Sequence, residues 1–86
     1  ILYIESLKDY VKIVTPIENY LVHKSLTSIT EELPQDQFLR IHRSFTVALD
    51  KIKSVEGNSV EINVTRIPIG RKYNNQAKQI ILNTLG

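Results

Sequence analysis

The chain has 86 residues, of which 42% are hydrophobic and 23% are charged, a balance that is ordinary for one small folded domain. It contains no cysteine, which excludes disulfides, thiol catalysis and cysteine-ligated zinc, and its two histidines are widely spaced. No segment reaches the roughly 18 apolar residues that a membrane-spanning helix needs, and none has the pattern of a signal peptide. We therefore expect an intracellular domain without a metal or cofactor.

The charges are distributed unevenly along the chain. Residues 1–61 contain seven bases and nine acids, a net charge of −2, whereas residues 62–86 contain four bases and no acid, so that the total is +2. The four bases of this tail are Arg66, Arg71, Lys72 and Lys78. A tail of one sign predicts an anionic partner, with nucleic acid as the first candidate and a membrane surface as the second. An ordinary basic helix is the alternative.

Apolar runs predict three short strands at the start of the chain, at residues 1–6, 10–14 and 20–23. Residues 7–9 form the first connecting turn, and residues 15–19, which include a proline and an asparagine, form the second. The chain begins inside an apolar run that is typical of the middle of a folded unit. We therefore expect that further residues precede Ile1.

A short helix is predicted after the third strand. Ser25 is suited to be its N-cap, Pro34 ends it, and its apolar stripe consists of Leu26, Ile29 and Leu33. The helix is acidic at Glu31 and Glu32. We expect it to be a scaffold element that faces away from any polyanion.

Residues 38–47 do not follow the alternation of apolar and polar side chains that a regular strand shows. A single strand here would place Arg43 on the same face as Ile41 and Phe45. An unpaired guanidinium in a core is prohibitively unfavourable, so either Arg43 has a buried partner or the strand breaks near residues 42–44. We predict the break, with Arg43 facing a ligand, because failures of local pattern often mark functional sites. His42 is expected to be a partly buried ring that fixes the bend.

The remaining segments predict a hairpin, an edge strand and a helix. Residues 48–55 and 60–64 flank a turn at Gly57-Asn58. Residues 66–69 contain a proline that cannot donate to a ladder, which is typical of an edge strand. Residues 71–82 form a terminal helix with an apolar face made by Tyr73, Ala77, Ile80 and Ile81.

The predicted terminal helix begins with two cations, Arg71 and Lys72, at the positive end of its macrodipole, where acids would be favoured. Free backbone N–H groups and two positive charges make a ready anion site. The alternative is a mildly unfavourable surface pair.

The chain lacks the motifs of common enzyme classes. It has no glycine-rich phosphate loop, no H-E-x-x-H and no serine elbow, and the proximity of His42 to Ser44 does not by itself make a base and a nucleophile. We expect no catalytic residue and no enzyme.

A nucleic-acid-binding function accounts for the basic residues of both segments at once. The planar fork of Arg43 suits guanine O6 and N7, while Arg71 and Lys72 suit phosphates or base edges. Neither an aromatic RNA-binding motif nor a helix-turn-helix is visible, so base readout is expected from loops. The competing hypothesis is a protein or anionic-membrane interaction module that uses the basic C-terminal segment without reading sequence.

The whole chain, residues 1–86, resembles the LytTR (LytR/AlgR-type) DNA-binding domain of bacterial response regulators. The resemblance lies in six segments in order, which are Ile1-Leu-Tyr-Ile-Glu-Ser6, Tyr10-Val-Lys-Ile-Val14, Lys24-Ser25-Leu26, Glu31-Glu32-Leu33-Pro34, Phe38-x-Arg40-Ile41-His42-Arg43-Ser44-Phe45-x-Val47 and Ile67-Pro68-Ile69-Gly70-Arg71-x-Tyr73. The last two are the most specific. One departure is Ala48, where many members have asparagine.

The resemblance implies a mainly β fold of small antiparallel sheets packed as an elongated β-sandwich, with one short internal helix and a C-terminal helix. It implies sequence-specific binding of double-stranded DNA by loops that enter successive major grooves, in a bacterial cytoplasm. Such proteins bind imperfect direct repeats in promoters as dimers, under control of a receiver domain and a sensor histidine kinase. They usually have one more strand before the position of Ile1, so that strand and the receiver are expected to be missing here.

Carried over residue by residue, the resemblance implies six DNA contacts, at Lys8, Asp9, Tyr10, Arg43, Arg71 and Lys72. His42, Ser44 and Arg40 are expected to support this site structurally.

Overall fold

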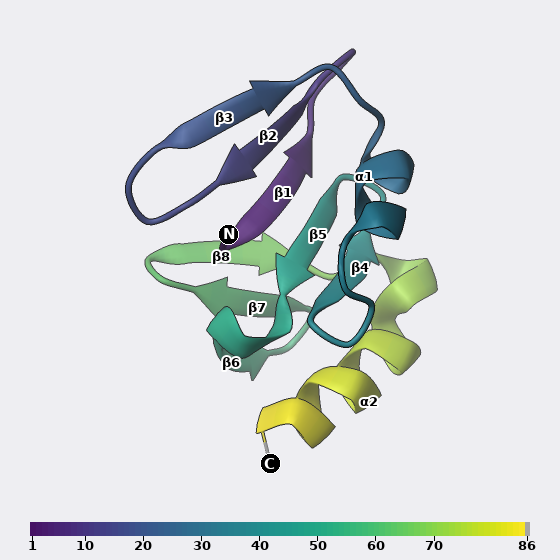
Figure 1. Cartoon of the computed structure of the whole chain (residues 1–86). Helices are drawn as coiled ribbons and strands as arrows, with labels where there is room; N and C mark the ends of the chain where they lie inside the picture. The colour runs from purple at the N-terminus through teal and green to yellow at the C-terminus, as the bar shows by residue number, and fades with distance from the viewer. Residues whose placement is uncertain (86) are drawn as a thin grey trace.

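The computed structural model describes residues 1–85 as a mainly β domain (Figure 1). The first half contains β1 (Tyr3–Ser6), β2 (Val11–Val14), β3 (Asn19–Val22), α1 (Leu26–Glu32), β4 (Phe38–His42) and β5 (Phe45–Ala48). The second half contains the 3-10 turn η1 (Leu49–Lys51), β6 (Ile52–Glu56), β7 (Ser59–Ile62), β8 (Thr65–Pro68), the 3-10 turn η2 (Arg71–Tyr73) and α2 (Asn74–Leu85). No helix in this part of the chain is long and apolar enough to cross a membrane.

The strands form two antiparallel sheets. The larger has the order β3-β2-β1-β5-β4, and the smaller has the order β6-β7-β8. In Figure 1 the larger sheet lies above the smaller one, α1 packs beside β4 and β5, and α2 lies along the lower side of the domain. The prediction of a mainly β fold with small antiparallel sheets, one internal helix and a C-terminal helix is therefore confirmed.

Side chains on the two faces of β1 belong to two separate apolar clusters. Ile4 is fully buried against the helix α1, together with Val11 and Leu26. The larger cluster joins the two sheets and α2, and its fully buried members are Ile41, Val47, Val60, Ile62, Ile67 and Ile81. The sheet-to-helix contact also contains Thr46, which is fully buried and shares a hydrogen bond of 2.7 Å with Thr30. Because this hydroxyl has a hydrogen-bond partner, the cost of removing it from water is offset.

The register of the larger sheet brings three connections to one end. Ser6 pairs with Val11, Val11 pairs with Val22, and His42 pairs with Phe45. The loops at residues 7–10 and 23–25 and the turn at residues 43–44 therefore emerge side by side, at the upper end of the sheet in Figure 1. The Ser6 N–H donates to the Ser44 carbonyl at 2.8 Å, which ties the first loop to the turn.

Three predicted elements are wrong in detail. The first arm of the hairpin, predicted over residues 48–55, begins only at Ile52, because Ala48 ends β5 and residues 49–51 form the turn η1. The strand predicted over residues 60–64 ends at Ile62, because Asn63 adopts a left-handed conformation (φ 57°) and turns the chain into β8. The helix predicted from Arg71 begins at Asn74, because the Tyr73 N–H donates to the Gly70 carbonyl at 3.0 Å and tightens residues 71–73 into a 3-10 turn. The predicted edge strand is confirmed, since β8 lies at the edge of the smaller sheet.

Candidate nucleic-acid interface

The turn between β4 and β5 exposes Arg43. The pairing of β4 with β5 shifts register between Arg40 and His42, so Ile41 stays fully buried while the chain reverses immediately afterwards. Arg43 is exposed, and among residues 1–85 its side chain has no hydrogen-bond or ion-pair partner. The predicted strand break is confirmed, and Arg43 is held outside the core.

Arg40 and His42 hold this turn from within. The Arg40 guanidinium donates to the carbonyl of His42 from Nε (2.8 Å), to the carbonyl of Arg43 from Nη2 (2.7 Å) and to the Thr27 hydroxyl from Nη1 (3.2 Å). His42 Nδ1 accepts from the Ser44 N–H at 3.0 Å. The His42 ring also lies against Phe45, with centroids 5.5 Å apart. The backbone that presents Arg43 is thus held by three side-chain hydrogen bonds, and the bond to Thr27 orients the Arg40 guanidinium.

The turn η2 lies directly beside the Arg43 turn. The Gly70 N–H donates to the Ile41 carbonyl at 2.8 Å, and this hydrogen bond holds the start of η2 against the end of β4. A Cβ on Gly70 would lie 3.1 Å from Tyr73 Cδ2 and 3.4 Å from His42 Cδ2, so this close approach depends on glycine.

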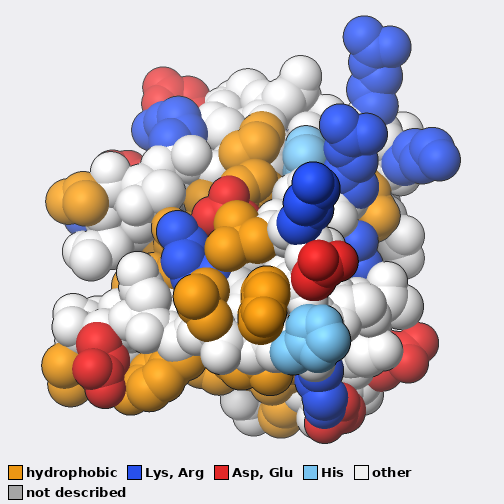
Figure 2. All heavy atoms as spheres, turned by 90° about the horizontal axis from the view of Figure 1, so that it is seen from above, with side chains coloured by type: hydrophobic (Ala, Val, Ile, Leu, Met, Phe, Trp, Pro, Cys, Tyr) orange, Lys and Arg blue, Asp and Glu red, His pale blue; other side chains and the backbone are white. Residues whose placement is uncertain are grey.

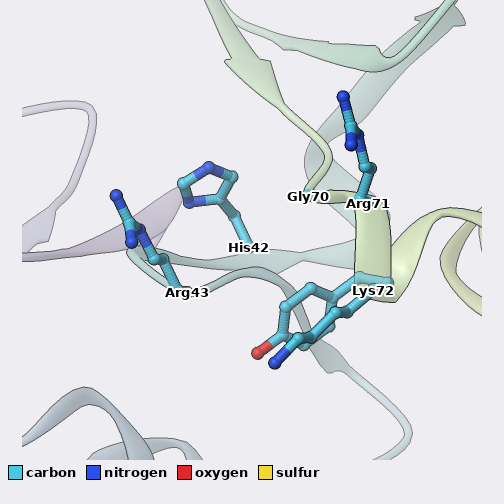
Figure 3. A pocket seen from close by; sticks show the side chains of 6 residues that line it. His42, Arg43, Gly70, Arg71 and Lys72 are labelled. Carbon is cyan, nitrogen blue, oxygen red and sulfur yellow. The ribbon is translucent and has the colours of Figure 1, made fainter.

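An open hollow of about 390 Å³ separates the two turns. Its lining residues are His42, Arg43, Gly70, Arg71, Lys72 and Tyr73. Figure 3 shows Arg43 and His42 on one side of this hollow and Arg71 and Lys72 on the other. Three cationic side chains and no acid line it, which makes it the more strongly positive of the two hollows on this face. We name it the Arg43 hollow.

A second hollow of about 320 Å³ lies at the same end of the larger sheet. It is lined by Lys8, Asp9, His23, Lys24 and Ser25. The next residue of the first loop, Tyr10, lies against the ring of His23, with centroids 5.1 Å apart and planes inclined by 51°. We name it the Lys8 hollow.

All six sequence-predicted contacts are brought to this end of the domain. Arg43, Arg71 and Lys72 line one hollow, Lys8 and Asp9 line the other, and Tyr10 adjoins it through His23. Figure 2, which looks down on this end, shows blue Lys and Arg side chains gathered on one side of the face beside pale-blue histidines. Whether these residues touch DNA stays a prediction.

Sequence reasoning missed His23 and Lys24, which line the Lys8 hollow. No local sequence signal places them there, because it is the pairing of β2 with β3 over four residues each that returns the chain after β3 to the loop before β2. The contact of His23 with Tyr10 places His23 in the candidate interface.

Among residues 1–85, no three His, Cys, Asp or Glu side chains are grouped as they would be in a metal site. The Tyr20 hydroxyl donates to Glu18 Oε1 at 2.6 Å, and this carboxylate, with a smaller effect of burial, raises the pKa of Tyr20 above its usual 10.0. Glu18 lies in the loop before β3 and Tyr20 near the start of β3, at the end of the sheet opposite the two hollows.

Comparisons with known proteins identify the relatives of this chain. Residues 1–82 match the profile of the LytTr DNA-binding domain. Relatives include the sensory transduction protein LytT of Bacillus subtilis, 29% identical over 94% of this chain, and that of Bacillus anthracis, 26% identical over 94%. The transcriptional regulatory protein YpdB of Escherichia coli is 36% identical over 65% of the chain. The chain spans about a third of the length of the LytT proteins, 35% to 36%.

A solved structure has the same fold. It is the LytTr DNA-binding domain of a putative methyl-accepting/DNA response regulator from Bacillus cereus, with a TM-score of 0.83 at 22% identity, over 93% of this chain and 79% of that one. The profile match covers nearly the whole chain and the expected fold is present. This chain therefore belongs to the family of LytTR DNA-binding domains.

Proposed function

We propose that this domain binds double-stranded DNA in a sequence-specific manner, as the output domain of a two-component response regulator. The observation that carries the proposal is the convergence of Arg43, Arg71 and Lys72 around one acid-free hollow. These residues come from two segments that are nearly thirty positions apart, and a hydrogen bond between Gly70 and Ile41 joins the segments.

Arg43 is the proposed base-reading residue. It stands at the tip of a two-residue turn that is narrow enough to enter a major groove of about 12 Å width. Its guanidinium is exposed and unpaired within residues 1–85, so its donors are available for guanine O6 and N7. Arg40, His42 and Ser44 support the reading by fixing the turn before DNA arrives.

Arg71 and Lys72 are the proposed backbone contacts beside the base-reading turn. Both are exposed and lie across the hollow from Arg43, where they can neutralise phosphates that flank the same groove. The loop that carries Lys8, Asp9 and Tyr10 emerges beside the Arg43 turn and is proposed to contact the adjacent part of the duplex.

The names of the relatives support a regulatory role for a longer protein. LytT is a sensory transduction protein and YpdB a transcriptional regulatory protein, and both are much longer than this chain. We propose that the full protein contains a receiver domain controlled by a sensor histidine kinase, that it binds imperfect direct repeats in promoters as a dimer, and that it acts in the bacterial cytoplasm.

In the competing hypothesis, the basic residues of segment 62–86 bind a protein or an anionic membrane. This requires them to form one patch. Arg66 instead pairs with Glu56 at 3.4 Å on the smaller sheet, and Lys78 lines neither of the two hollows on this face. The tail is therefore divided, and only Arg71 and Lys72 join Arg43.

Selection from a random duplex pool, followed by titration, tests the proposal. The chain should enrich one sequence pattern and bind the selected duplex about a thousandfold or more tighter than random duplex at physiological salt. Vesicles with anionic lipids serve as the competing ligand. A specificity ratio near one, or tighter binding to the vesicles, would contradict the proposed function.

A further inference from the structure

The Lys8 hollow has the chemistry of an oxyanion site. Lys8 and Lys24 supply positive charge, and the imidazole of His23 supplies a ring N–H, against the single acid Asp9. The contact between His23 and Tyr10 holds the loop after β3 against the loop before β2. Three donors are thus brought to one place by the register of the sheet, although Lys8 and Lys24 are distant in sequence.

The width of the sheet decides which part of a duplex this hollow meets. Four strand spacings separate β3 from β4 in the larger sheet, which is about 19 Å at the usual spacing of about 4.8 Å. The major groove is only about 12 Å wide. A duplex whose groove receives Arg43, next to β4, therefore presents sugar-phosphate backbone rather than the same groove to the loop after β3.

Lys24 has a competing partner inside the domain. Its ammonium pairs with the carboxylate of Glu32, at the end of α1, and the two side chains are 41% and 59% exposed. Ion pairs this exposed contribute little stability, so a phosphate can displace the carboxylate. The neighbouring Glu31 is also exposed but has no ion-pair partner among residues 1–85, which makes it a matched control.

We propose that Lys8, His23 and Lys24 bind a phosphate of the DNA backbone, and that Glu32 competes with this phosphate for Lys24. The inference rests on the proposed DNA binding and extends it to the loop after β3. It assigns α1 a role other than that of a scaffold facing away from DNA, because the end of this helix restrains a DNA-binding lysine.

A double-mutant cycle on the selected duplex tests the competition. Lys24→Gln should lower affinity about eightfold at 0.1 M salt and reduce the magnitude of the salt slope by about 0.9, as expected for one lost phosphate contact. Glu32→Gln should raise affinity about 1.5- to 5-fold by releasing Lys24. Glu31→Gln should raise it less, since only long-range charge changes. In the Lys24→Gln background, Glu32→Gln and Glu31→Gln should become equal.

Controls separate the contact from folding and from bulk charge. Lys24→Arg keeps the charge and should keep the salt slope, and Lys51→Gln, which removes a lysine near the opposite end of the domain, should leave the slope nearly unchanged. Circular dichroism melts should be alike for all these variants, since each substituted side chain is exposed.

Neutral methylphosphonate linkages identify the phosphate. At the contacted position, such a linkage should weaken wild-type binding and leave Lys24→Gln binding unaffected. The inference is overturned if Lys24→Gln keeps the full salt slope, or if Glu32→Gln and Glu31→Gln have equal effects in the wild-type background. Absence of selective DNA binding by the wild-type chain would instead refute the proposed function. Failure of the phosphate contact and failure of the proposed function are therefore distinguishable.

Discussion

The guanidinium of Arg40 donates a hydrogen bond of 2.7 Å to the backbone carbonyl of Arg43, so one arginine holds the turn that exposes the other. The same guanidinium binds the carbonyl of His42, and its third bond reaches Thr27 on α1. The position of Arg43 is therefore tied both to β4 and to the internal helix. Because a preorganised turn loses less entropy on binding, this arrangement favours a precise contact.

Replacing Arg40 should loosen the turn. Arg40→Ala should lower the free energy of unfolding by about 1 to 3 kcal/mol, because two carbonyls lose a charged donor. Arg40→Lys should recover only part of this loss, since a point charge cannot reproduce the forked geometry. Urea denaturation and duplex titration measure both effects. Equal stability and affinity of Arg40→Lys and the wild type would contradict the role of the fork.

Arg43→Ala should leave stability unchanged and impair recognition. The side chain is exposed and makes no hydrogen bond or ion pair within residues 1–85 that would be lost on truncation, so the melting temperature should stay within experimental error. Binding to the selected duplex should weaken by about 1 to 3 kcal/mol, with relaxed preference at one base position. Competition between duplexes that differ at single positions measures this change. Unchanged affinity for the selected duplex would refute base reading by Arg43.

His42→Ala should reduce stability first. The substitution leaves the Ser44 N–H without its acceptor and removes the contact with the Phe45 ring. The expected loss is about 1 to 3 kcal/mol of unfolding free energy. Thermal melts at matched protein concentration measure it, and binding should fall mainly because the turn is less ordered. An unaltered melting temperature with abolished binding would show instead that His42 contacts DNA directly.

Arg71→Ala and Lys72→Ala should weaken binding to all sequences alike. Each should reduce the magnitude of the salt slope by about 1 if its side chain neutralises one phosphate. Lys53→Ala, which removes an exposed lysine of β6 that lines neither hollow, is the matched control and should leave the slope nearly unchanged. Fluorescence anisotropy over a range of salt concentrations measures the slopes. A change in base preference without a change in slope would assign these residues to base edges.

Gly70→Ala should separate the two turns that surround the Arg43 hollow. Its Cβ would lie 3.1 Å from the ring of Tyr73, and the His42 ring lies just beyond, so one of these rings has to move. Overpacking of this kind costs about 1 to 3 kcal/mol of stability. DNA affinity should fall as well, because Arg71 and Lys72 shift relative to Arg43. Wild-type stability and affinity in Gly70→Ala would show that η2 adjusts freely.

The local features of the chain were predictable from sequence. The cap of α1 is confirmed, because the Ser25 hydroxyl accepts from the Ser28 N–H at 3.0 Å. The break after His42 is confirmed for an equally local reason, since a guanidinium in an apolar period has to leave the core. Both features depend on residues within a few positions of one another.

The start of the last helix was predicted wrongly because a distant contact decides it. The Gly70 N–H is bound to the Ile41 carbonyl of β4, which anchors the chain before Arg71 and leaves residues 71–73 as a tight turn. Nothing within residues 70–82 encodes this contact. The end of β7 is a smaller error, since Asn63 tolerates the left-handed conformation and the alternating pattern concealed that property.

The sequence by itself determined the strands and the two α-helices in outline, the outward position of Arg43 and, through its motifs, the expectation of DNA binding. Only the tertiary structure decided which basic residues share a surface: Arg71 and Lys72 join Arg43, Arg66 joins Glu56, and Lys24 with His23 joins Lys8. The physical reason is strand register. Hydrogen bonding between strands sets which loops meet at one end of a sheet, and that pairing is a long-range property that hydrophobic period along the chain does not contain.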